Sequence, residues 1–279
     1  VYVAPNSRFD KEVTGGEDRY YHLVLLAENN QGYANLMKIV SRGYVEGFYY
    51  RPRVDMEVLE QFHEGIIALS ACLAGEVPRL LARGMYEEAK EAALRYEQIF
   101  GKDNYFLELQ DHGIPEQATV NQQLLRLGRE TGIGLVATND VHYTMAEDAE
   151  PHDILLCLQT GKKLTDTDRL RYEGGQYYVK SPEEMARLFP YALEALENTQ
   201  RIADRCHVEI EFGVTKLPRY DVPEGTTAWE YLNKLCREGL AERYNPVTEE
   251  LEERLDYELN TIKTMGYVDY FLIVWDFIH

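Results

Sequence analysis

Asp140 and His142 are the residues whose types and spacing point most directly to chemistry. They stand two apart at the end of Gly134–Tyr143, an apolar, β-branched segment that we predict to be a strand. Side chains two apart on a strand share a face, so this carboxylate and imidazole are expected to point into one site. Such donors suit Zn²⁺, Mn²⁺ or Fe. Taken alone the spacing is common, and capping of the following turn by Asp140 stays open as the alternative.

Two further candidates stand near the ends of predicted strands. Cys72 closes Gly65–Cys72, and His22 stands near the start of Tyr21–Ala27. Taken singly, Cys72 is typical of a small buried apolar residue, and His22 of a hydrogen-bonded core residue. In parallel βα folds, functional residues gather at the carboxyl ends of the strands. Cys72 meets that condition, whereas His22 lies at an apparent amino end, so the geometry leaves its role undecided.

Other polar residues give weaker indications. His112 follows a predicted strand and would line the same site, although a turn residue is the favoured interpretation. Asp166 and Asp168 lie in a charged loop and are expected to be solvated. The aromatic run Phe48–Arg51 resembles a platform on which bases stack, while a packing cluster in a βα loop explains it at least as well.

The elements that must position these residues alternate along residues 20–143. Short apolar strands are predicted at Tyr21–Ala27, Gly65–Cys72, Tyr105–Gln110 and Gly134–Tyr143. Between them, Tyr86–Phe100 and Gln117–Glu130 carry the apolar stripe of amphipathic helices, and the second stops at Gly132. This alternation is typical of parallel βα units, arranged in an open sheet or a closed barrel.

Helices dominate the rest of the chain. They are predicted at Ala149–Leu158, Tyr191–Cys206, Ala228–Arg243, Thr248–Met265 and Asp269–His279. A further helix is expected to begin after Ser181, which would be its N-cap. Thr160–Gln176 is polar and Gly-rich and is expected to form a loop. Leu217–Thr226 holds two prolines and a glycine, which makes it the predicted domain boundary.

Composition limits the classes of function. The formal net charge of −19 predicts that this chain alone binds DNA weakly or not at all, because duplex binding draws on clustered Lys and Arg. The four cysteines form no CxxC pair, which fits a reducing cytoplasm. No apolar run approaches the roughly 20 residues that cross a bilayer, so no membrane partner is expected. Both ends have the pattern of interrupted elements, and we expect a segment of a longer protein.

Three stretches resemble the PHP (polymerase and histidinol phosphatase) domain of the bacterial DNA polymerase III alpha-subunit family. They are Tyr21–Leu36 (YHLVLLAENNQGYANL), Gly65–Glu76 (GIIALSACLAGE) and Leu135–Tyr143 (LVATNDVHY). Downstream, Leu217–Tyr244 and Arg254–His279 resemble the segment that leads into the polymerase palm. The resemblance covers essentially the whole chain in the family's order.

The resemblance implies a fold and a ligand set. Residues 1–216 would form an incomplete PHP-type (β/α)7 barrel without its N-terminal strands, and residues 217–279 the mainly helical start of the palm. His22, Cys72, Asp140 and His142 would be metal ligands. The family's other ligands, in HxH and TDH segments and a Glu, would precede Val1. We therefore expect an incomplete site that holds at most substoichiometric metal.

The resemblance also implies a function. The intact subunit would synthesise DNA with Mg²⁺ in chromosome replication, and would meet DNA and other replisome subunits. Its PHP site, with Zn, Mn or Fe, would serve 3′–5′ exonuclease proofreading or support the polymerase structurally. The acidic polymerase residues would lie beyond His279, so this chain is not expected to polymerise. A free-standing PHP phosphoesterase and a non-catalytic scaffold or interaction module are the alternatives.

Overall fold

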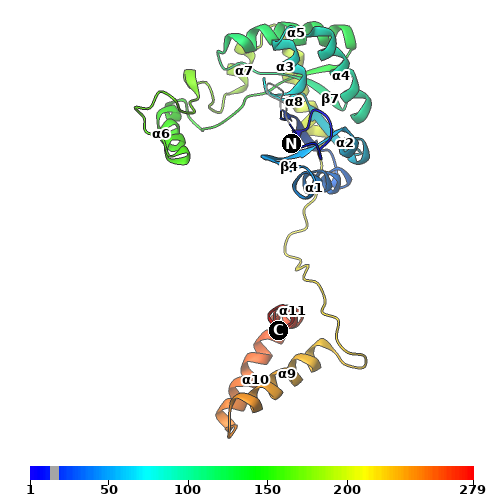
Figure 1. The fold of residues 1–279 in the computed structure, drawn as a ribbon, viewed down its shortest axis with the longest axis vertical. Helices are drawn as coiled ribbons and strands as arrows, with labels where there is room; N and C mark the ends of the chain where they lie inside the picture. The colour runs from blue at the N-terminus through cyan, green and yellow to red at the C-terminus, as the bar shows by residue number, and fades with distance from the viewer. Residues whose placement is uncertain (13–18) are drawn as a thin grey trace. The chain divides into compact units, whose positions relative to one another are not determined.

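The computed structural model describes residues 1–12 and 19–279 (Figure 1). The chain divides into two compact units, Val1–Glu209 and Ile210–His279, called unit 1 and unit 2 below. The division and the predicted boundary at 216/217 both fall in the segment between helices α8 and α9. The assignment of residues 1–216 to a PHP domain and 217–279 to the start of the palm stays a prediction.

Unit 1 is built on two four-stranded sheets. The first has the order β2-β1-β5-β4, and the second β3-β6-β7-β8. Their strands are β1 Tyr2–Val3, β2 Tyr21–His22, β3 Val24–Ala27, β4 Phe48–Tyr49, β5 Arg51–Val54, β6 Ile66–Leu69, β7 Tyr105–Leu109 and β8 Gly134–Ala137. Because only Leu23 separates β2 from β3, one extended segment joins both sheets.

The parallel arrangement predicted from the sequence is confirmed for part of the second sheet. Strands β6, β7 and β8 are parallel neighbours. It is wrong for β3, which pairs antiparallel with β6 along Val24–Ala27. The chain between these two strands passes through α1, the β4–β5 hairpin and α2, so the connection is no simple βαβ crossover and imposes no parallel pairing.

Helices cover these sheets (Figure 1). In unit 1 they are α1 Asn30–Val45, α2 Met56–Phe62, α3 Glu76–Ala82, α4 Tyr86–Phe100, α5 Pro115–Thr131, α6 Ala149–Thr160, α7 Pro182–Leu188 and α8 Leu193–Arg205, with short 3₁₀ turns at Ala146–Asp148 and Glu173–Gly175. Every residue of β7 is buried. Leu107 packs in a cluster with Leu124 of α5, while Phe106 packs in a second cluster with Ile202 of α8. The central strand is therefore covered on both faces, as its apolar run predicts.

Helix ends follow local rules that the sequence shows. Gly132 takes a left-handed conformation with φ of 78° and ends α5. Ser181 caps α7 by accepting a hydrogen bond from the backbone N–H of Glu184, whose carboxylate accepts from the backbone N–H of Ser181. Both predicted signals are confirmed, because each depends on a single residue type at a fixed position.

A buried ion pair fixes the chain's N-terminal segment to α2. Asp55 is 4% exposed and Arg8 is 8% exposed. The carboxylate of Asp55 accepts from the backbone N–H and from Nη1 of Arg8 at 2.8 and 2.9 Å. It also caps α2 by accepting from the backbone N–H of Val58 at 3.2 Å. One carboxylate thus satisfies a helix end and a buried guanidinium together.

Unit 2 consists of three helices, as predicted. They are α9 Ala228–Arg243, α10 Glu249–Thr264 and α11 Val268–Ile278. Leu232, Leu259 and Leu272, one from each helix, form its core. Among the described residues, none of the helices of either unit is long and apolar enough to span a membrane.

Candidate metal site

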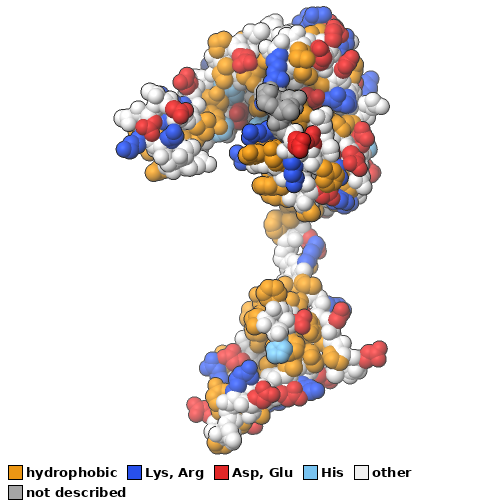
Figure 2. Space-filling view, viewed as in Figure 1, with side chains coloured by type: hydrophobic (Ala, Val, Ile, Leu, Met, Phe, Trp, Pro, Cys, Tyr) orange, Lys and Arg blue, Asp and Glu red, His pale blue; other side chains and the backbone are white. Residues whose placement is uncertain are grey.

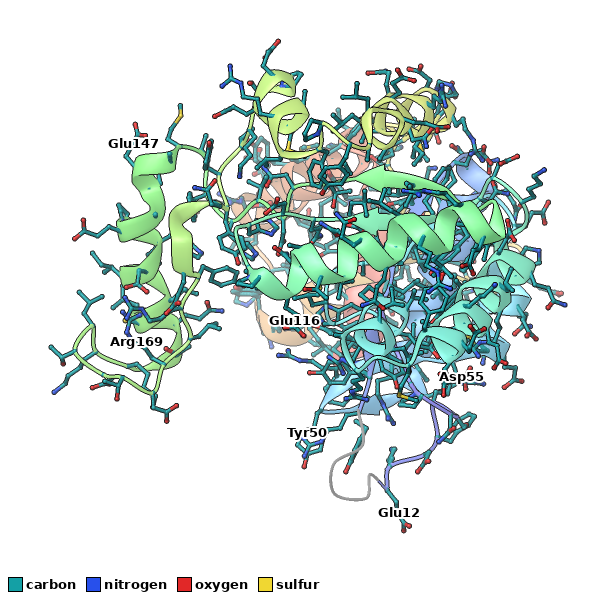
Figure 3. All side chains as sticks on the ribbon, turned by 90° about the horizontal axis from the view of Figure 1, so that it is seen from above. Glu12, Tyr50, Asp55, Glu116, Glu147 and Arg169 are labelled. Carbon is teal, nitrogen blue, oxygen red and sulfur yellow. The ribbon has the colours of Figure 1, made fainter. Side chains whose placement is uncertain are left out.

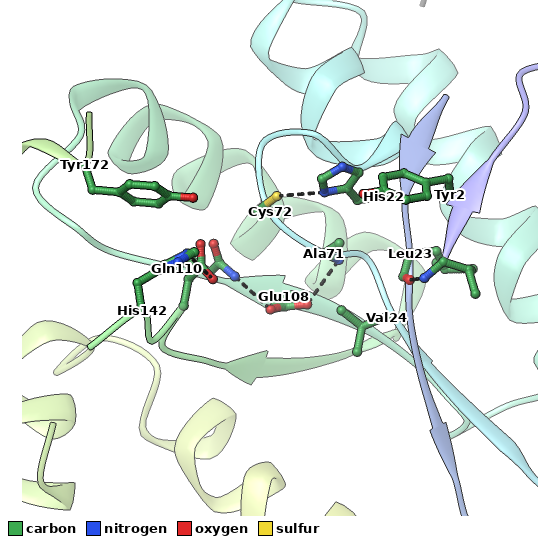
Figure 4. A pocket seen from close by; sticks show the side chains of 12 residues that line it. Tyr2, His22, Leu23, Val24, Ala71, Cys72, Glu108, Gln110, His142 and Tyr172 are labelled. Carbon is green, nitrogen blue, oxygen red and sulfur yellow. Dashed lines mark hydrogen bonds and ion pairs between the residues drawn. The ribbon is translucent and has the colours of Figure 1, made fainter. Parts of the chain in front are cut away.

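All four residues that the family resemblance marks as ligands line one pocket of unit 1, with a volume of about 560 Å³ (Figure 4). His22, Cys72, Asp140 and His142 reach it from three places in the fold. The remaining lining residues are Val1, Tyr2, Leu23, Val24, Ala71, Glu108, Gln110 and Tyr172. The fold therefore brings together side chains that lie up to 120 positions apart, from His22 to His142.

Asp140 and His142 reach the pocket from a loop. The predicted strand Gly134–Tyr143 ends as β8 at Ala137, so the argument from strand periodicity is wrong for these two residues. β8 ends where β7 does, and the chain then leaves the sheet toward α6. The backbone N–H of His142 donates to the carbonyl of Tyr177 at 2.8 Å, which holds the loop. Nε2 of His142 nevertheless lies 3.2 Å from Oδ1 of Asp140, so the two side chains are in contact although they do not lie on a strand.

The antiparallel pairing of β3 settles the position of His22. Since β3 runs opposite to β6, the amino end of β3 meets the carboxyl end of β6, and Cys72 follows that end. The backbone N–H of His22 donates to the carbonyl of Ala74 at 2.9 Å. Nδ1 of His22 lies 3.7 Å from Sγ of Cys72. His22 thus lies at the same edge of the sheet as the other candidates, a placement that the sequence left undecided.

Burial sets the protonation of the pair formed by His22 and Cys72. Desolvation lowers the pKa of His22, which favours the neutral imidazole. Desolvation also raises the pKa of the Cys72 thiol. A neutral imidazole is the ligating form of histidine, but cysteine ligates as thiolate. Binding of a cation here would therefore release the thiol proton and depend on pH.

The donor types fit a transition metal, while their spacing divides them into two pairs. Imidazole, thiolate and carboxylate together suit Zn²⁺ and its neighbours in the first transition series. In residues 1–12 and 19–279, no group of three or more His, Cys, Asp or Glu side chains is arranged to hold a metal ion. His22 with Cys72 and Asp140 with His142 therefore form two half-sites that face one pocket.

Glu108 connects the loop of Cys72 with the loop that leads to Asp140 and His142. It was not among the residues that the sequence indicated. Glu108 is 5% exposed, and its carboxylate accepts from the backbone N–H of Ala71 at 3.1 Å. It also accepts from Nε2 of Gln110 at 3.0 Å and from the hydroxyl of Thr138. Burial raises its pKa. The only signal in the sequence was an acidic residue inside the apolar run Tyr105–Leu109.

Removal of the Glu108 carboxylate should weaken the fold around the pocket. We expect Glu108→Ala to lower the free energy of unfolding by about 1–3 kcal/mol, because it leaves the buried N–H of Ala71 without an acceptor and removes the links to Gln110 and Thr138. Glu108→Gln keeps one carbonyl acceptor and should lose less. Urea unfolding followed by circular dichroism measures both, and equal losses in the two variants would contradict this role.

Residues that gave weaker indications lie elsewhere or serve packing. His112 is buried, its ring stacks on Tyr177 with centroids 4.3 Å apart, and Nδ1 lies 3.0 Å from Nε2 of Gln117. It is not among the residues that line the pocket. Tyr172, which no motif indicated, does line it, and its ring centroid lies 4.2 Å from that of His142. Asp166 and Asp168 lie outside it as well.

Comparison with known proteins gives two family matches. Residues 1–112 match the PHP domain, and residues 230–279 match the bacterial DNA polymerase III alpha NTPase domain. His22 and Cys72 fall within the first match, whereas Asp140 and His142 lie beyond it. The two matches occur in the order that the resemblance implies.

Curated relatives match along the whole chain. DNA polymerase III subunit alpha of Treponema pallidum is 50% identical over 279 residues, all of this chain and 24% of the relative. The Borreliella burgdorferi subunit is 47% identical and the Thermus aquaticus subunit 38% identical, again over all of this chain and over 24% and 28% of those proteins. The chain thus spans about a quarter of the length of the relatives it matches. It belongs to the bacterial DNA polymerase III alpha-subunit family.

Proposed function

We propose that this chain is the PHP part of a replicative DNA polymerase subunit, and that its pocket is a metal site for phosphodiester hydrolysis. The observation that carries the proposal is the convergence of His22, Cys72, Asp140 and His142 on one pocket from three separate segments. In this function the site removes nucleotides in the 3′–5′ direction during proofreading.

The residues of the pocket have distinct parts in this proposal. His22 and Cys72 would hold a divalent ion from one side, and Asp140 and His142 from the other. Zn, Mn and Fe suit these donors. A bound divalent metal supplies Lewis acidity to a phosphodiester and lowers the pKa of a water molecule. Glu108 holds the loops of both pairs together, and Tyr172 covers the imidazole of His142.

DNA synthesis belongs to the longer protein in this proposal. There the polymerase domain would use Mg²⁺ to transfer nucleotides to a DNA strand, in the cytoplasm and together with other replisome subunits. The names of the relatives support this assignment, since each is called DNA polymerase III subunit alpha. The match of residues 230–279 to the polymerase-specific family supports it further and disfavours a free-standing PHP phosphoesterase.

A structural role for the pocket is the second candidate. The arrangement of the four ligands in two pairs favours it, because a metal centre would need them gathered around one ion. In that case the domain would support the polymerase without chemistry of its own. Metal binding separates the two functions.

Titration with Co²⁺ tests the proposed site directly. A cobalt ion bound by Cys72 gives a thiolate-to-metal absorption band in the near ultraviolet, because Co²⁺ occupies zinc sites and accepts thiolate ligands. We expect a band of substoichiometric intensity in this chain, because the ligand set implied by the family is incomplete here, and we expect Cys72→Ser to remove it. The band should strengthen as pH rises, since the metal displaces a proton from the thiol.

Cys206→Ser is the matched control. Cys206 is a half-buried free thiol of unit 1, as Cys72 is, but it lies outside the pocket. That variant should keep the band at full strength. A band that persists in Cys72→Ser, or no band at any pH, would count against the metal site and in favour of the structural role.

A further inference from the structure

Tyrosine and arginine side chains follow one another across the first sheet, beginning at the pocket. Tyr2 and His22 both line the pocket, and they are register partners in strands β1 and β2. The ring centroids of Tyr2 and Tyr20 lie 4.8 Å apart. The rings of Tyr20 and His22 are parallel within 6°, with centroids 6.3 Å apart. Three aromatic rings thus continue the wall of the pocket onto the surface of the sheet.

Arginines extend this row toward the turn between β4 and β5, where Tyr50 lies. The guanidinium of Arg51, in β5, lies 5.8 Å from the ring centroid of Tyr2. The guanidinium of Arg19 lies 4.3 Å from the ring centroid of Tyr50. We call the five residues Tyr2, Arg19, Tyr20, Tyr50 and Arg51 the tyrosine–arginine track.

The outer end of the track is open to solvent. Tyr50 is 62% exposed, and Figure 3 shows its side chain at the margin of unit 1. Its φ of 60° is unusual for a residue other than glycine. Arg19 and Arg51 are exposed, and within the described part of the chain neither guanidinium takes part in an ion pair. The track therefore has cations that no carboxylate of the described residues neutralises.

Neighbouring residues of the same sequence run serve the fold instead. Arg53 is 1% exposed, and Nη2 donates to the backbone carbonyls of Arg8 and Asp10 at 3.2 and 2.6 Å. Its guanidinium also lies 5.0 Å from the ring of Tyr49. The packing interpretation of the run Phe48–Arg51 thus fits Tyr49. The ring of Tyr50 meets that of Tyr49 edge-on, with centroids 4.7 Å apart, but Tyr50 itself stays 62% exposed and its face is open to a ligand.

Flat rings interleaved with guanidinium groups match the chemistry of single-stranded nucleic acid. Bases stack on aromatic rings and on guanidinium planes, and arginines neutralise the phosphates between them. The two arginines give this surface local positive charge, although the chain as a whole carries a formal net charge of −19. Figure 2 shows acidic and basic side chains mixed over the visible face of both units.

We propose that the tyrosine–arginine track is a binding surface for single-stranded nucleic acid, which it leads to the pocket at Tyr2 and His22. The inference rests on the proposed function for its purpose, because it supplies the path by which a strand end reaches the site. Binding along the track needs no metal. An acidic protein segment would use the two arginines alone and would gain little from the rings.

A binding measurement in the presence of EDTA tests the track on the whole 279-residue chain. The probe is a fluorescein-labelled oligothymidylate of about 12 nucleotides, within the usual site size of such surfaces. Fluorescence anisotropy at low salt should show weak binding. Tyr50→Leu should weaken the binding about 10-fold through the loss of one stacking platform, whereas Tyr50→Phe, which keeps a ring, should bind as the unmodified chain does. Arg19→Gln with Arg51→Gln should lower the salt dependence of log K by about 1.4.

Unit 2 provides a matched control. There Arg254 lies 5.9 Å from the ring of Tyr257, which is 65% exposed, but its guanidinium is paired with Glu258, so the same two side-chain types occur without an unpaired cation. Arg254→Gln and Tyr257→Leu should leave binding unchanged. Thermal melting of every variant confirms that it is folded.

Three outcomes would overturn the inference. The first is no binding by the unmodified chain at low salt, and the second is equal weakening by the unit 2 variants. The third is loss of binding in the arginine variant with none in Tyr50→Leu, together with displacement of the probe by polyglutamate, which would show a surface for acidic polymers. EDTA removes metal from the binding test. A failure to bind the oligothymidylate therefore says nothing about the metal site, and absence of the cobalt band says nothing about the track.

Discussion

The combined replacement Asp140→Asn and His142→Ala should abolish the proposed metal-dependent 3′–5′ nuclease activity of the longer protein and largely spare its proposed DNA synthesis. The two changes remove one of the two half-sites, the carboxylate and imidazole that lie 3.2 Å apart. Loss of ligands lowers both metal affinity and Lewis acidity, so we expect hydrolysis to fall by at least about 100-fold. Release of labelled nucleotides from a single strand measures the nuclease, and primer extension measures synthesis.

A control for this prediction is the pair His63→Ala and Asp168→Asn. These residues have the same types but lie outside the pocket. The control should retain both activities. If the double replacement at Asp140 and His142 instead reduces nuclease and synthesis in equal measure, the pocket supports the fold of the subunit, and the structural role replaces the catalytic one.

Asp55→Ala should strongly destabilise unit 1. It leaves the guanidinium of Arg8, which is 8% exposed, without its buried partner and removes the cap of α2. Breaking a buried ion pair from one side costs about 3–5 kcal/mol, since the remaining charge stays desolvated. Glu46 and Glu57 also contact Arg8 and will offset part of that loss. We therefore expect the free energy of unfolding to fall by about 3 kcal/mol or more.

Replacement of both Arg8 and Asp55 by apolar residues provides the control. Arg8→Met combined with Asp55→Leu removes both charges, so it should recover a substantial part of the stability that Asp55→Ala loses. Asp55→Asn keeps the helix cap, so its free energy of unfolding should lie between those of Asp55→Ala and the double variant. Urea unfolding measures all three variants. A double variant no more stable than Asp55→Ala would show that the hydrogen bonds to the backbone, rather than the buried charge, carry the stabilisation.

Local signals predicted the elements of this chain well and their pairing less well. The helices of unit 2 and the ends at Gly132 and Ser181 were predictable, because periodicity and caps depend on neighbouring residues. The end of β8 at Ala137 was not, since Val141 and Tyr143 continue the apolar pattern beyond the strand. Burial on both faces of β7 followed from its apolar run, but that run gave no indication that Glu108 would link two loops.

The sequence by itself determined which residue types are available to the site, namely Cys72, Asp140 and His142 near the carboxyl ends of strands. It also determined the family through strings that need no structure to be read. Only the tertiary structure decided the place of His22. The antiparallel pairing of β3 with β6 turns an amino end toward a carboxyl end, and no local pattern encodes which way a distant strand will run. The same pairing puts Nδ1 of His22 3.7 Å from Sγ of Cys72, while the loop after β8 brings Asp140 and His142 to the same pocket.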